Sequence, residues 1–353
     1  MFEENRIKRY LQLVKDIKKE YKLIYIHVHP LEIIFNTLKY VPNSQNNNIY
    51  SIHNSKYIPP KIGPFKIEQY NKVNRVDNDG IMNKFALMKI NKSYSHIGLK
   101  VISDHMKLSG IDSVMLLPVA QSNESANDQM DIITKIYGTN GKFVYAYSIP
   151  NSIINENILD VVKESVRRFN IKALKLHPNI TGINLSSKTG IQRVEAILSV
   201  SNEMQLPLII HGGRSPVIKN KDTSEYSIIK NLIKVDWGIS KETVVIAHAG
   251  AFGCEVEEYE NDVFPILKKM LSHFSNIMVD ISGLDINILL KVLKHINADR
   301  IIFGSDALYN MQWIYTVMLL YALDELYDSV EEKFIQIVSL NPRKYVLKEL
   351  EVI

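Results

Sequence analysis

IYIHVHP, residues 24–30, is a short apolar stretch rich in strand-forming residues, and it carries two histidines two positions apart. Side chains alternate between the two faces of a strand, so His27 and His29 are predicted to point the same way. Inside a parallel sheet, both imidazoles would project from the carboxyl end of the strand into one space. Two imidazoles placed in this way are half of a metal site, and the rest of the chain must supply the other half.

Further apolar runs follow at 113–118, 142–147, 171–178, 206–213, 243–250, 276–282 and 300–306. They recur at roughly 25 to 35 residues, which is the spacing of strand–helix units. The runs are continuous rather than alternating, which indicates burial on both faces of a parallel sheet. With the first strand, the pattern predicts an α/β fold of the (β/α)8 barrel type, and a doubly wound open sheet is the alternative.

Helical periodicity separates these strands and flanks them. Ile7, Tyr10, Leu11, Val14 and Ile17 predict an N-terminal helix that covers one end of the barrel. Helical patterns between the strands cover 97–108, 128–136, 156–169, 192–204, 227–235, 263–274 and 286–295, and 311–326 and 330–340 follow the last strand.

One long segment interrupts this rhythm directly after the first strand. Residues 41–95 are rich in Asn, Ser, Tyr and Pro and include a low-complexity run at 43–48. A stretch of this length without periodicity is typical of an insertion or of a lid that closes over a substrate. We interpret approximately 31–95 as an insertion within a single domain that spans 1–353, and a lid is the alternative.

The composition narrows the class of protein. The chain has 353 residues, 46% hydrophobic and 23% charged, which is typical of a globular protein with a large core. Its net charge of +4 is not concentrated in a basic stripe, so no nucleic-acid partner is expected. Cys254 is the only cysteine, so no intramolecular disulfide can form, and we interpret it as a core or loop residue. With no apolar signal segment or membrane span in the sequence, we expect a soluble cytoplasmic protein that acts on a small molecule.

Ionisable residues gather where the predicted strands end: His27, His29, Lys175, His177, His211, His248, Asp280 and Asp306. The carboxyl ends of barrel strands share one face, and active sites are built there. His27, His29, His211 and Asp306 would supply three nitrogens and one oxygen, a set that suits a catalytic Zn²⁺ with a free position for water. The alternative is a set of core histidines whose hydrogen bonds are satisfied within the protein.

Four other residues have less definite roles. Lys175 and His177 share one face of their strand, so either could contact substrate. Arg214 could pair with an acidic substrate through two parallel hydrogen bonds, or it could be a solvated loop residue. Asp280 could orient a metal-bound histidine, or it could cap the end of its strand.

The ordered set resembles the amidohydrolase superfamily. Lys-Leu-His-Pro (175–178), His-Ala-Gly (248–250), Val-Asp-Ile-Ser-Gly (279–283), Phe-Gly-Ser-Asp (303–306) and Asn-Pro-Arg-Lys (341–344) are similar to the branch that contains aminocarboxymuconate-semialdehyde decarboxylase and many metal-dependent hydrolases. The resemblance implies that His27, His29 and His211 bind a catalytic metal, with Asp306 as ligand or general base. It also implies that His248 polarises the substrate.

The resemblance bears on the metal count as well. Relatives with two metals carry a carbamylated bridging lysine on the fourth strand, where this chain has Lys175. We expect Lys175 to act as a catalytic residue or substrate-binding cation at a site for one Zn²⁺, with a purely structural role for Lys175, and Mn²⁺ or a second metal, as alternatives. Relatives in the branch also suggest a homodimer.

Three functions fit these expectations. The first is a hydrolase in which a metal-activated water attacks an amide, ester or lactone carbonyl, Asp306 takes the proton and His248 stabilises the oxyanion. The second is a nonoxidative decarboxylase of an unsaturated or aromatic acid that uses the same ligands. The third is a catalytically silent barrel that serves as a binding module.

Overall fold

A computed structural model describes residues 4–30, 60–65, 98–138, 141–215, 221–306 and 312–349. Eight parallel strands form one sheet in which each strand pairs with the next along the chain. The strands are β1 (Ile24–Val28), β2 (Ser113–Leu116), β3 (Phe143–Ser148), β4 (Ala173–Leu176), β5 (Leu208–Ile210), β6 (Val244–Ile246), β7 (Ile277–Asp280) and β8 (Ile301–Ile302). This sequential order confirms the predicted barrel and excludes the doubly wound sheet, whose strand order reverses part-way.

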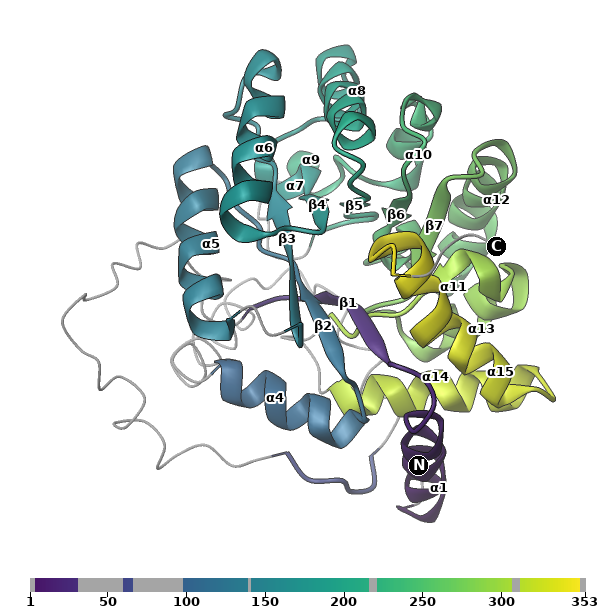
Figure 1. Ribbon diagram of the computed structural model, residues 1–353. Helices are drawn as coiled ribbons and strands as arrows, with labels where there is room; N and C mark the ends of the chain where they lie inside the picture. Colours follow the sequence, from purple (N-terminus) through teal and green to yellow (C-terminus); the bar gives the residue numbers. More distant parts are fainter. Residues whose placement is uncertain are drawn as a thin grey trace.

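Backbone hydrogen bonds bring the last strand back to the first. The Ile26 N–H donates to the Phe303 carbonyl at 3.1 Å, and the N–H groups of Ser305 and Asp306 donate to the His27 carbonyl at 3.2 and 3.0 Å. The ring of strands is thereby nearly closed, with the helices around it (Figure 1). His27 at the end of the first strand and Asp306 after the last strand are thereby direct neighbours.

The helices between the strands cover the outside of the barrel (Figure 1), and helices such as α6 (Ile158–Phe169) bury one face, with Ile158, Val162, Ser165 and Phe169 spaced three or four residues apart. The α-helices are α1 (Glu4–Ile17), α4 (Gly98–Ser109), α5 (Asn123–Tyr137), α6 (Ile158–Phe169), α7 (Pro178–Thr181), α8 (Lys188–Glu203), α9 (Lys221–Ser224), α10 (Ile229–Leu232), α11 (Val256–Glu258), α12 (Phe264–His273), α13 (Ile286–His295), α14 (Gln312–Leu326) and α15 (Val330–Ile335). Shorter 3₁₀ turns lie at Asn155–Asn157, Trp237–Ile239, Ala247–Gly250 and Ala298–Arg300, and π-helical turns at Tyr259–Val263, Gln336–Leu340 and Pro342–Val346.

Two helices begin earlier than their apolar periodicity indicates, because a polar residue caps each of them. The side chain of Ser122 accepts from the Ser125 N–H, so α5 begins at Asn123 rather than near residue 128. Ser187 likewise accepts from the Gly190 N–H at the start of α8. The helix predicted over 227–235 is only one turn long as α10, and it leads into the 3₁₀ turn at Trp237–Ile239.

Side chains alternate along each strand between the inside and the outside of the barrel, so the core has an inner and an outer part. The inner cluster fills the barrel and consists of Ile24, Ile26, Met115, Leu117, Ala146, Ala173, Ile209, Val245, Met278, Ile302 and Val346, with smaller contributions from partly buried neighbours. The outer cluster joins the strands to the helices and includes Tyr25 and Val28 on β1. Ile26 and Val28 would share a face in a regular strand, so β1 is irregular between them.

A bulge in β1 explains this irregularity. Tyr25 is aligned with Val114 and Val28 with Leu116, so the step covers three residues of β1 and only two of β2. The extra residue shifts the alternation, which turns Val28 outward and directs His27 into the barrel. The inward direction of His27 therefore comes from the bulge.

Some predictions concern residues or properties that the structure describes only in part. Most of the insertion predicted over 31–95 lies outside them; within it, only 60–65 are described, where Phe65 packs edge-on against Trp313 of α14 at 5.7 Å between ring centroids. No described helix combines the length and apolar character that crossing a membrane would need. The predicted homodimer stays a prediction.

Candidate metal and catalytic site

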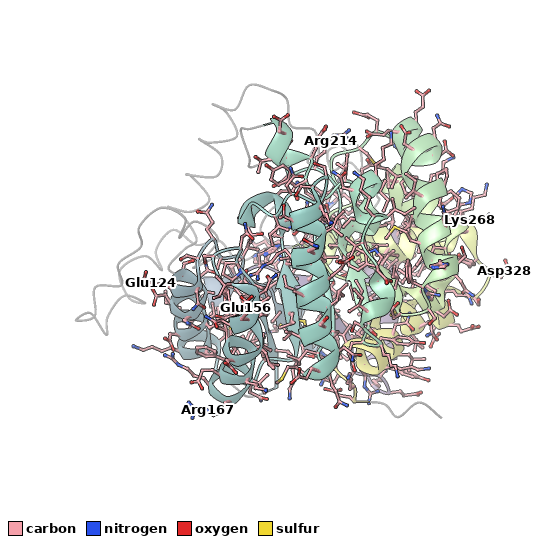
Figure 2. All side chains as sticks on the ribbon, turned by 90° about the horizontal axis from the view of Figure 1, so that it is seen from above. Glu124, Glu156, Arg167, Arg214, Lys268 and Asp328 are labelled. Carbon is pink, nitrogen blue, oxygen red and sulfur yellow. The ribbon has the colours of Figure 1, made fainter. Side chains whose placement is uncertain are left out.

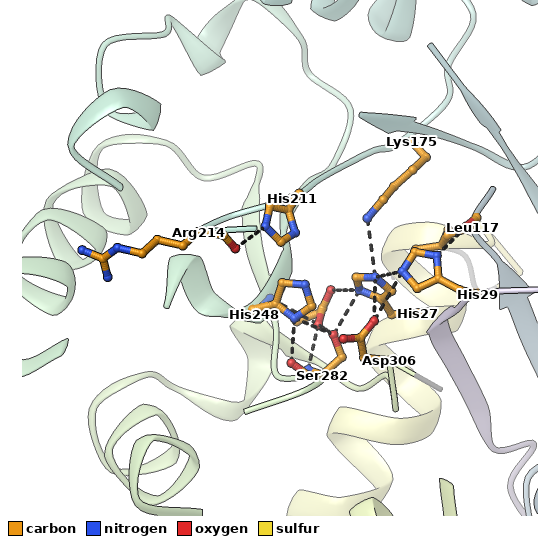
Figure 3. Close-up of polar contacts among 10 residues, drawn as sticks. His27, His29, Leu117, Lys175, His211, Arg214, His248, Ser282 and Asp306 are labelled. Carbon is orange, nitrogen blue, oxygen red and sulfur yellow. Dashed lines mark hydrogen bonds and ion pairs between the residues drawn. The ribbon is translucent and has the colours of Figure 1, made fainter. Parts of the chain in front are cut away.

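His27 lies at the centre of the candidate site, where β1 meets the bonds that close the barrel. Its ring Nδ1 lies 2.8 Å from Asp280 Oδ2, so Nδ1 carries the proton and donates it to the carboxylate. Nε2 is then an unprotonated acceptor, 3.2 Å from His29 Nε2 and 3.7 Å from Asp306 Oδ1 (Figure 3). Burial, followed by the charge of Lys175, lowers the pKa of His27 to about 3, so the neutral ring persists at neutral pH.

The ring of His29 is also oriented by a hydrogen bond from its Nδ1, but the acceptor is a backbone carbonyl. Its Nδ1 lies 2.7 Å from the carbonyl oxygen of Leu117, so Nδ1–H donates to the backbone and Nε2 faces the site. Nε2 is 3.3 Å from Asp306 Oδ1. The side chain of His29 is 12% exposed, against 1% for His27 and 4% for Asp306, so the site is approached from its side.

His248 enters the site from the turn after β6. Its Nδ1 lies 2.8 Å from the Ser282 carbonyl, which leaves Nε2 as the atom able to bind a ligand. His248 and Asp306 adopt left-handed backbone conformations with φ of 56° and 51°. Such conformations are costly for residues with a Cβ and concentrate at functional sites, where surrounding contacts hold them in place. Burial lowers the pKa of His248, which favours the neutral ring.

Asp280, the last residue of β7, and nearby Ser282 hold these histidines from behind. Asp280 Oδ2 accepts from His27, and its Oδ1 accepts from the N–H of Ser282 at 2.8 Å and from the Ser282 hydroxyl. Ser282 Oγ also lies 3.0 Å from His27 Nδ1 and 3.2 Å from His248 Nδ1. Burial raises the pKa of Asp280, but the neighbouring His27 and its hydrogen bond outweigh burial, and the pKa ends below its ordinary range.

Lys175 is the cation of the site. It points inward from β4 because it lies two residues after Ala173 of the inner cluster, and it is fully buried. Its Nζ lies 3.5 Å from His27 Nε2, at the limit of a hydrogen bond (Figure 3). Burial lowers the pKa of Lys175 to about 8, although Asp280 and Asp306 act in the opposite direction.

These donors fit a divalent cation. One ligand atom from each of His27, His248 and Asp306 lies within 4.8 Å of the others. His29 Nε2 lies beside two of them, so imidazole nitrogens and a carboxylate oxygen converge with their lone pairs directed inward. Imidazole with carboxylate is a donor set that suits Zn²⁺ and other transition metals. The structure thus holds a cluster that could bind a divalent metal ion.

His211, predicted as a ligand, lies beside this cluster rather than among its three members. Its Nε2 lies 3.1 Å from the carbonyl oxygen of Arg214, and its ring centroid is 5.1 Å from that of His248. Because Nε2–H donates to this carbonyl, Nδ1 is the atom that could bind a metal. Metal binding by His211 stays a prediction.

The two predicted substrate-binding residues occupy different surroundings. His177 stacks on His211 with ring centroids 3.9 Å apart, and among the described residues its buried Nδ1 has no hydrogen-bond partner. Arg214 forms two hydrogen bonds with Glu258, at 2.8 and 2.7 Å, and a third with Glu225 at 3.4 Å. Substrate binding by either residue stays a prediction, and for Arg214 it would require the guanidinium to leave these carboxylates.

Two groups of the site, Ser282 and the Leu117 carbonyl, were not among the residues predicted from sequence. Serine follows Asp280 at the i+2 position, so a shared strand face could have indicated it. The Leu117 carbonyl is a backbone atom and leaves no signal in side-chain patterns.

Comparison with solved structures reveals the same fold in enzymes of several reaction types. A putative amidohydrolase from Staphylococcus aureus has a TM-score of 0.52 at 15% identity, covering 74% of this chain and 95% of that one. A 4-oxalomesaconate hydratase from Rhodopseudomonas palustris has a TM-score of 0.51 at 14% identity, covering 93% and 96%. A dihydroxybenzoic acid decarboxylase from Polaromonas sp. JS666, with bound manganese and the inhibitor 2-nitroresorcinol, has a TM-score of 0.51 at 11% identity, covering 79% and 95%.

Neither a family model nor a curated protein matches the sequence. At the level of fold, the structural matches agree with the resemblance that the sequence motifs indicate. They include proteins named for hydrolysis, hydration and decarboxylation, so the fold leaves the reaction open.

Proposed function

We propose that this protein is an enzyme of the amidohydrolase superfamily that hydrolyses an amide, ester or lactone with one divalent metal ion. The observation that carries the proposal is the convergence of unprotonated donors: His27 Nε2, His29 Nε2 and Asp306 Oδ1 lie within 3.7 Å of one another. The proposed ion is Zn²⁺, because imidazole nitrogens outnumber oxygens in this set, and Mn²⁺ is the alternative.

A divalent ion in this position would lower the pKa of a water molecule and polarise a substrate carbonyl. The residues of the chain supply the remaining steps. Burial raises the pKa of Asp306, but the surrounding imidazoles of His248, His27 and His29 outweigh burial and keep its pKa below the ordinary range. Asp306 is therefore ionised and can accept a proton from the attacking water. Nε2 of His248 is the group available to polarise a substrate oxygen.

Decarboxylation of an unsaturated or aromatic acid is the second candidate, and Lys175 is the observation that favours it. Its buried ammonium lies 3.5 Å from His27 Nε2 and could pair with a substrate carboxylate. The manganese-containing decarboxylase of the same fold supports this candidate at the level of fold alone.

Elemental analysis of the purified protein and a product assay test the proposal together. We expect about one equivalent of Zn²⁺ or Mn²⁺ per chain, and incorporation of ¹⁸O from labelled water into the product of an active ester, amide or lactone. Carbon dioxide release without ¹⁸O incorporation would replace hydrolysis by decarboxylation. A metal-free protein that retains full activity would rule out both.

A variant separates the two roles of Asp306. Asp306→Asn keeps an oxygen donor but cannot accept a proton, so we expect activity to fall strongly while much of the metal is retained. Loss of metal in proportion to activity would indicate that Asp306 acts only as a ligand.

A further inference from the structure

The segment after β5 is joined to the segment after β6 by backbone contacts. The N–H of Arg214 donates to the Phe252 carbonyl at 2.8 Å, and the N–H of Phe252 donates to the Gly212 carbonyl at 3.3 Å. A Cβ on Gly213 would lie 2.5 Å from the Phe252 nitrogen, and φ of Gly213 is +115°. Only glycine allows the two segments to approach this closely, so the backbone around Arg214 has a defined position.

The side chain of Arg214 fixes the same segment from the other side. Its guanidinium pairs with both carboxylate oxygens of Glu258, at the end of α11, and donates to the Gly253 carbonyl at 3.1 Å. Two parallel hydrogen bonds between arginine and carboxylate define an orientation as well as a distance. Side chains of Arg214 and Glu258 are 35% and 32% exposed, so the pair is half-buried at the rim of the barrel.

The backbone carbonyl of Arg214 faces the opposite way, toward the site. It lies 3.1 Å from His211 Nε2, so the imidazole donates Nε2–H and keeps the lone pair on Nδ1 (Figure 3). Arg214 therefore connects two features: its side chain forms the ion pair with Glu258 at the rim, and its carbonyl determines which nitrogen of His211 carries the proton.

We propose that Arg214 is a positioning residue: paired with Glu258, it holds its own carbonyl where that carbonyl fixes the tautomer and rotation of His211. Partners of this kind tune metal ligands through the hydrogen bond made by the second ring nitrogen, and their loss commonly weakens metal affinity by about 10- to 100-fold. This inference rests on the proposed function in so far as His211 serves the metal site, and it assigns to Arg214 a role other than direct contact with substrate.

The chain offers a matched control for an ion pair of the same type. Arg167 pairs with Glu164 through two hydrogen bonds of 2.9 and 2.7 Å on the surface of α6. Figure 2 shows Arg214 and Arg167 near opposite ends of the barrel. Arg167→Gln removes a paired arginine without touching the site, so effects specific to Arg214 will be absent from it.

The first measurement is long-range ¹H–¹⁵N NMR of protein labelled with ¹⁵N-histidine, with the His211 signals assigned by their loss in His211→Gln. We expect the wild-type protein and Arg167→Gln to show His211 protonated on Nε2. Arg214→Gln should shift His211 toward a mixture of tautomers, and Arg214→Lys, which can still donate to Glu258, should restore part of the wild-type pattern. Wild-type His211 signals in Arg214→Gln would overturn the proposal. If Arg214→Gln fails to fold, Glu258→Gln, which weakens the same pair with little change in shape, decides the question.

The second measurement is the affinity for Zn²⁺ and Mn²⁺, by competition with a chelating dye. We expect binding to weaken about 10- to 100-fold in Arg214→Gln and to stay unchanged in Arg167→Gln. A wild-type protein that binds neither metal would contradict the proposed function, whereas the NMR result would still decide whether Arg214 sets the His211 tautomer. A shifted tautomer with unchanged metal affinity would overturn the link between Arg214 and the metal site.

Discussion

His27 and His29 each donate their Nδ1 proton to an acceptor on the side of the ring away from the candidate site. Asp280 Oδ2 and the Leu117 carbonyl each take an Nδ1–H, so both Nε2 lone pairs face inward at a separation of 3.2 Å. Lone pairs at this distance repel unless a cation lies between them or beside them. A proton on His27 is disfavoured because burial lowers its pKa to about 3. The metal ion of the proposed function, bound by both nitrogens, would satisfy them.

Ser282 gives a test of how far this orientation depends on neighbours. Ser282→Ala removes the hydroxyl that lies 3.0 Å from His27 Nδ1 and 3.2 Å from His248 Nδ1, while the backbone carbonyl that accepts from His248 remains. We expect Zn²⁺ affinity to fall about tenfold, measured by competition with a chelating dye. Ser199→Ala is the control, because within the described residues the Ser199 hydroxyl bonds only to the Glu195 carbonyl, on the exposed face of α8. Equal affinities in the two variants would contradict the role of Ser282.

Cys254 is predicted to be unreactive in the folded protein. Burial, followed by the charge of Glu258, raises the pKa of its thiol to about 12. The reactive thiolate is then about one part in ten thousand at pH 8. We expect no modification by iodoacetamide over an hour at pH 8 and complete modification in urea, followed by mass spectrometry. Rapid labelling of the native protein would show that the thiol is accessible and ionised.

At the scale of elements, the bulge in β1 decides what the His-x-His motif does. Sequence alone places His27 and His29 on one face of a strand, and this follows from alternation. Ile24 and Ile26 fill the barrel, so an unbroken alternation would put His27 outside with Tyr25. The three-to-two step between β1 and β2 reverses this. Register between strands depends on contacts between residues far apart in the chain. The motif could therefore predict that His27 and His29 share a face, but not that this face lies inside the barrel.

The strand-end residues of the later strands were predictable because their strands are regular. Lys175, Asp280 and their inward direction follow from alternation with Ala173 and Met278 of the inner cluster. The position of His248 was less predictable, since it lies beyond β6 in a turn with positive φ. Helix existence followed from periodicity, but helix starts depended on caps such as Ser122, whose effect needs the local backbone.

Gly304 gives a prediction about the contact between β8 and β1. A Cβ on Gly304 would lie 2.4 Å from the Cβ of His27 and 2.9 Å from its backbone nitrogen. Gly304→Ala must therefore push the two segments apart, and we expect a loss of about 3 kcal/mol in the free energy of unfolding, together with weaker metal binding. Urea denaturation and dye competition measure the two effects. Gly63→Ala, where an added Cβ meets no atom of the described residues within 4 Å, should change neither.

At the scale of the whole molecule, the barrel interior changes character along its axis. The apolar inner cluster fills the part of the interior away from the carboxyl ends of the strands, whereas those carboxyl ends hold buried histidines, a lysine and two carboxylates. Burial of neutral histidine is favourable at neutral pH and becomes costly in acid, because the unfolded chain can take up protons that the folded chain excludes. The site thus makes the stability of the metal-free protein depend on pH.

The sign of this dependence follows from His27, whose pKa is about 3 in the folded protein, against an ordinary value of 6.5 for histidine in an unfolded chain. As the pH falls below 6.5, the unfolded chain binds a proton that folded His27 does not, so stability is lost between about pH 6.5 and pH 3. At pH 5 the loss from His27 alone is about 2 kcal/mol relative to pH 7.5. Urea denaturation in EDTA at the two pH values measures the total change. We expect His27→Asn to be less sensitive to acid than the wild-type protein, and an equal sensitivity would show that His27 is protonated in the folded state near its ordinary pKa.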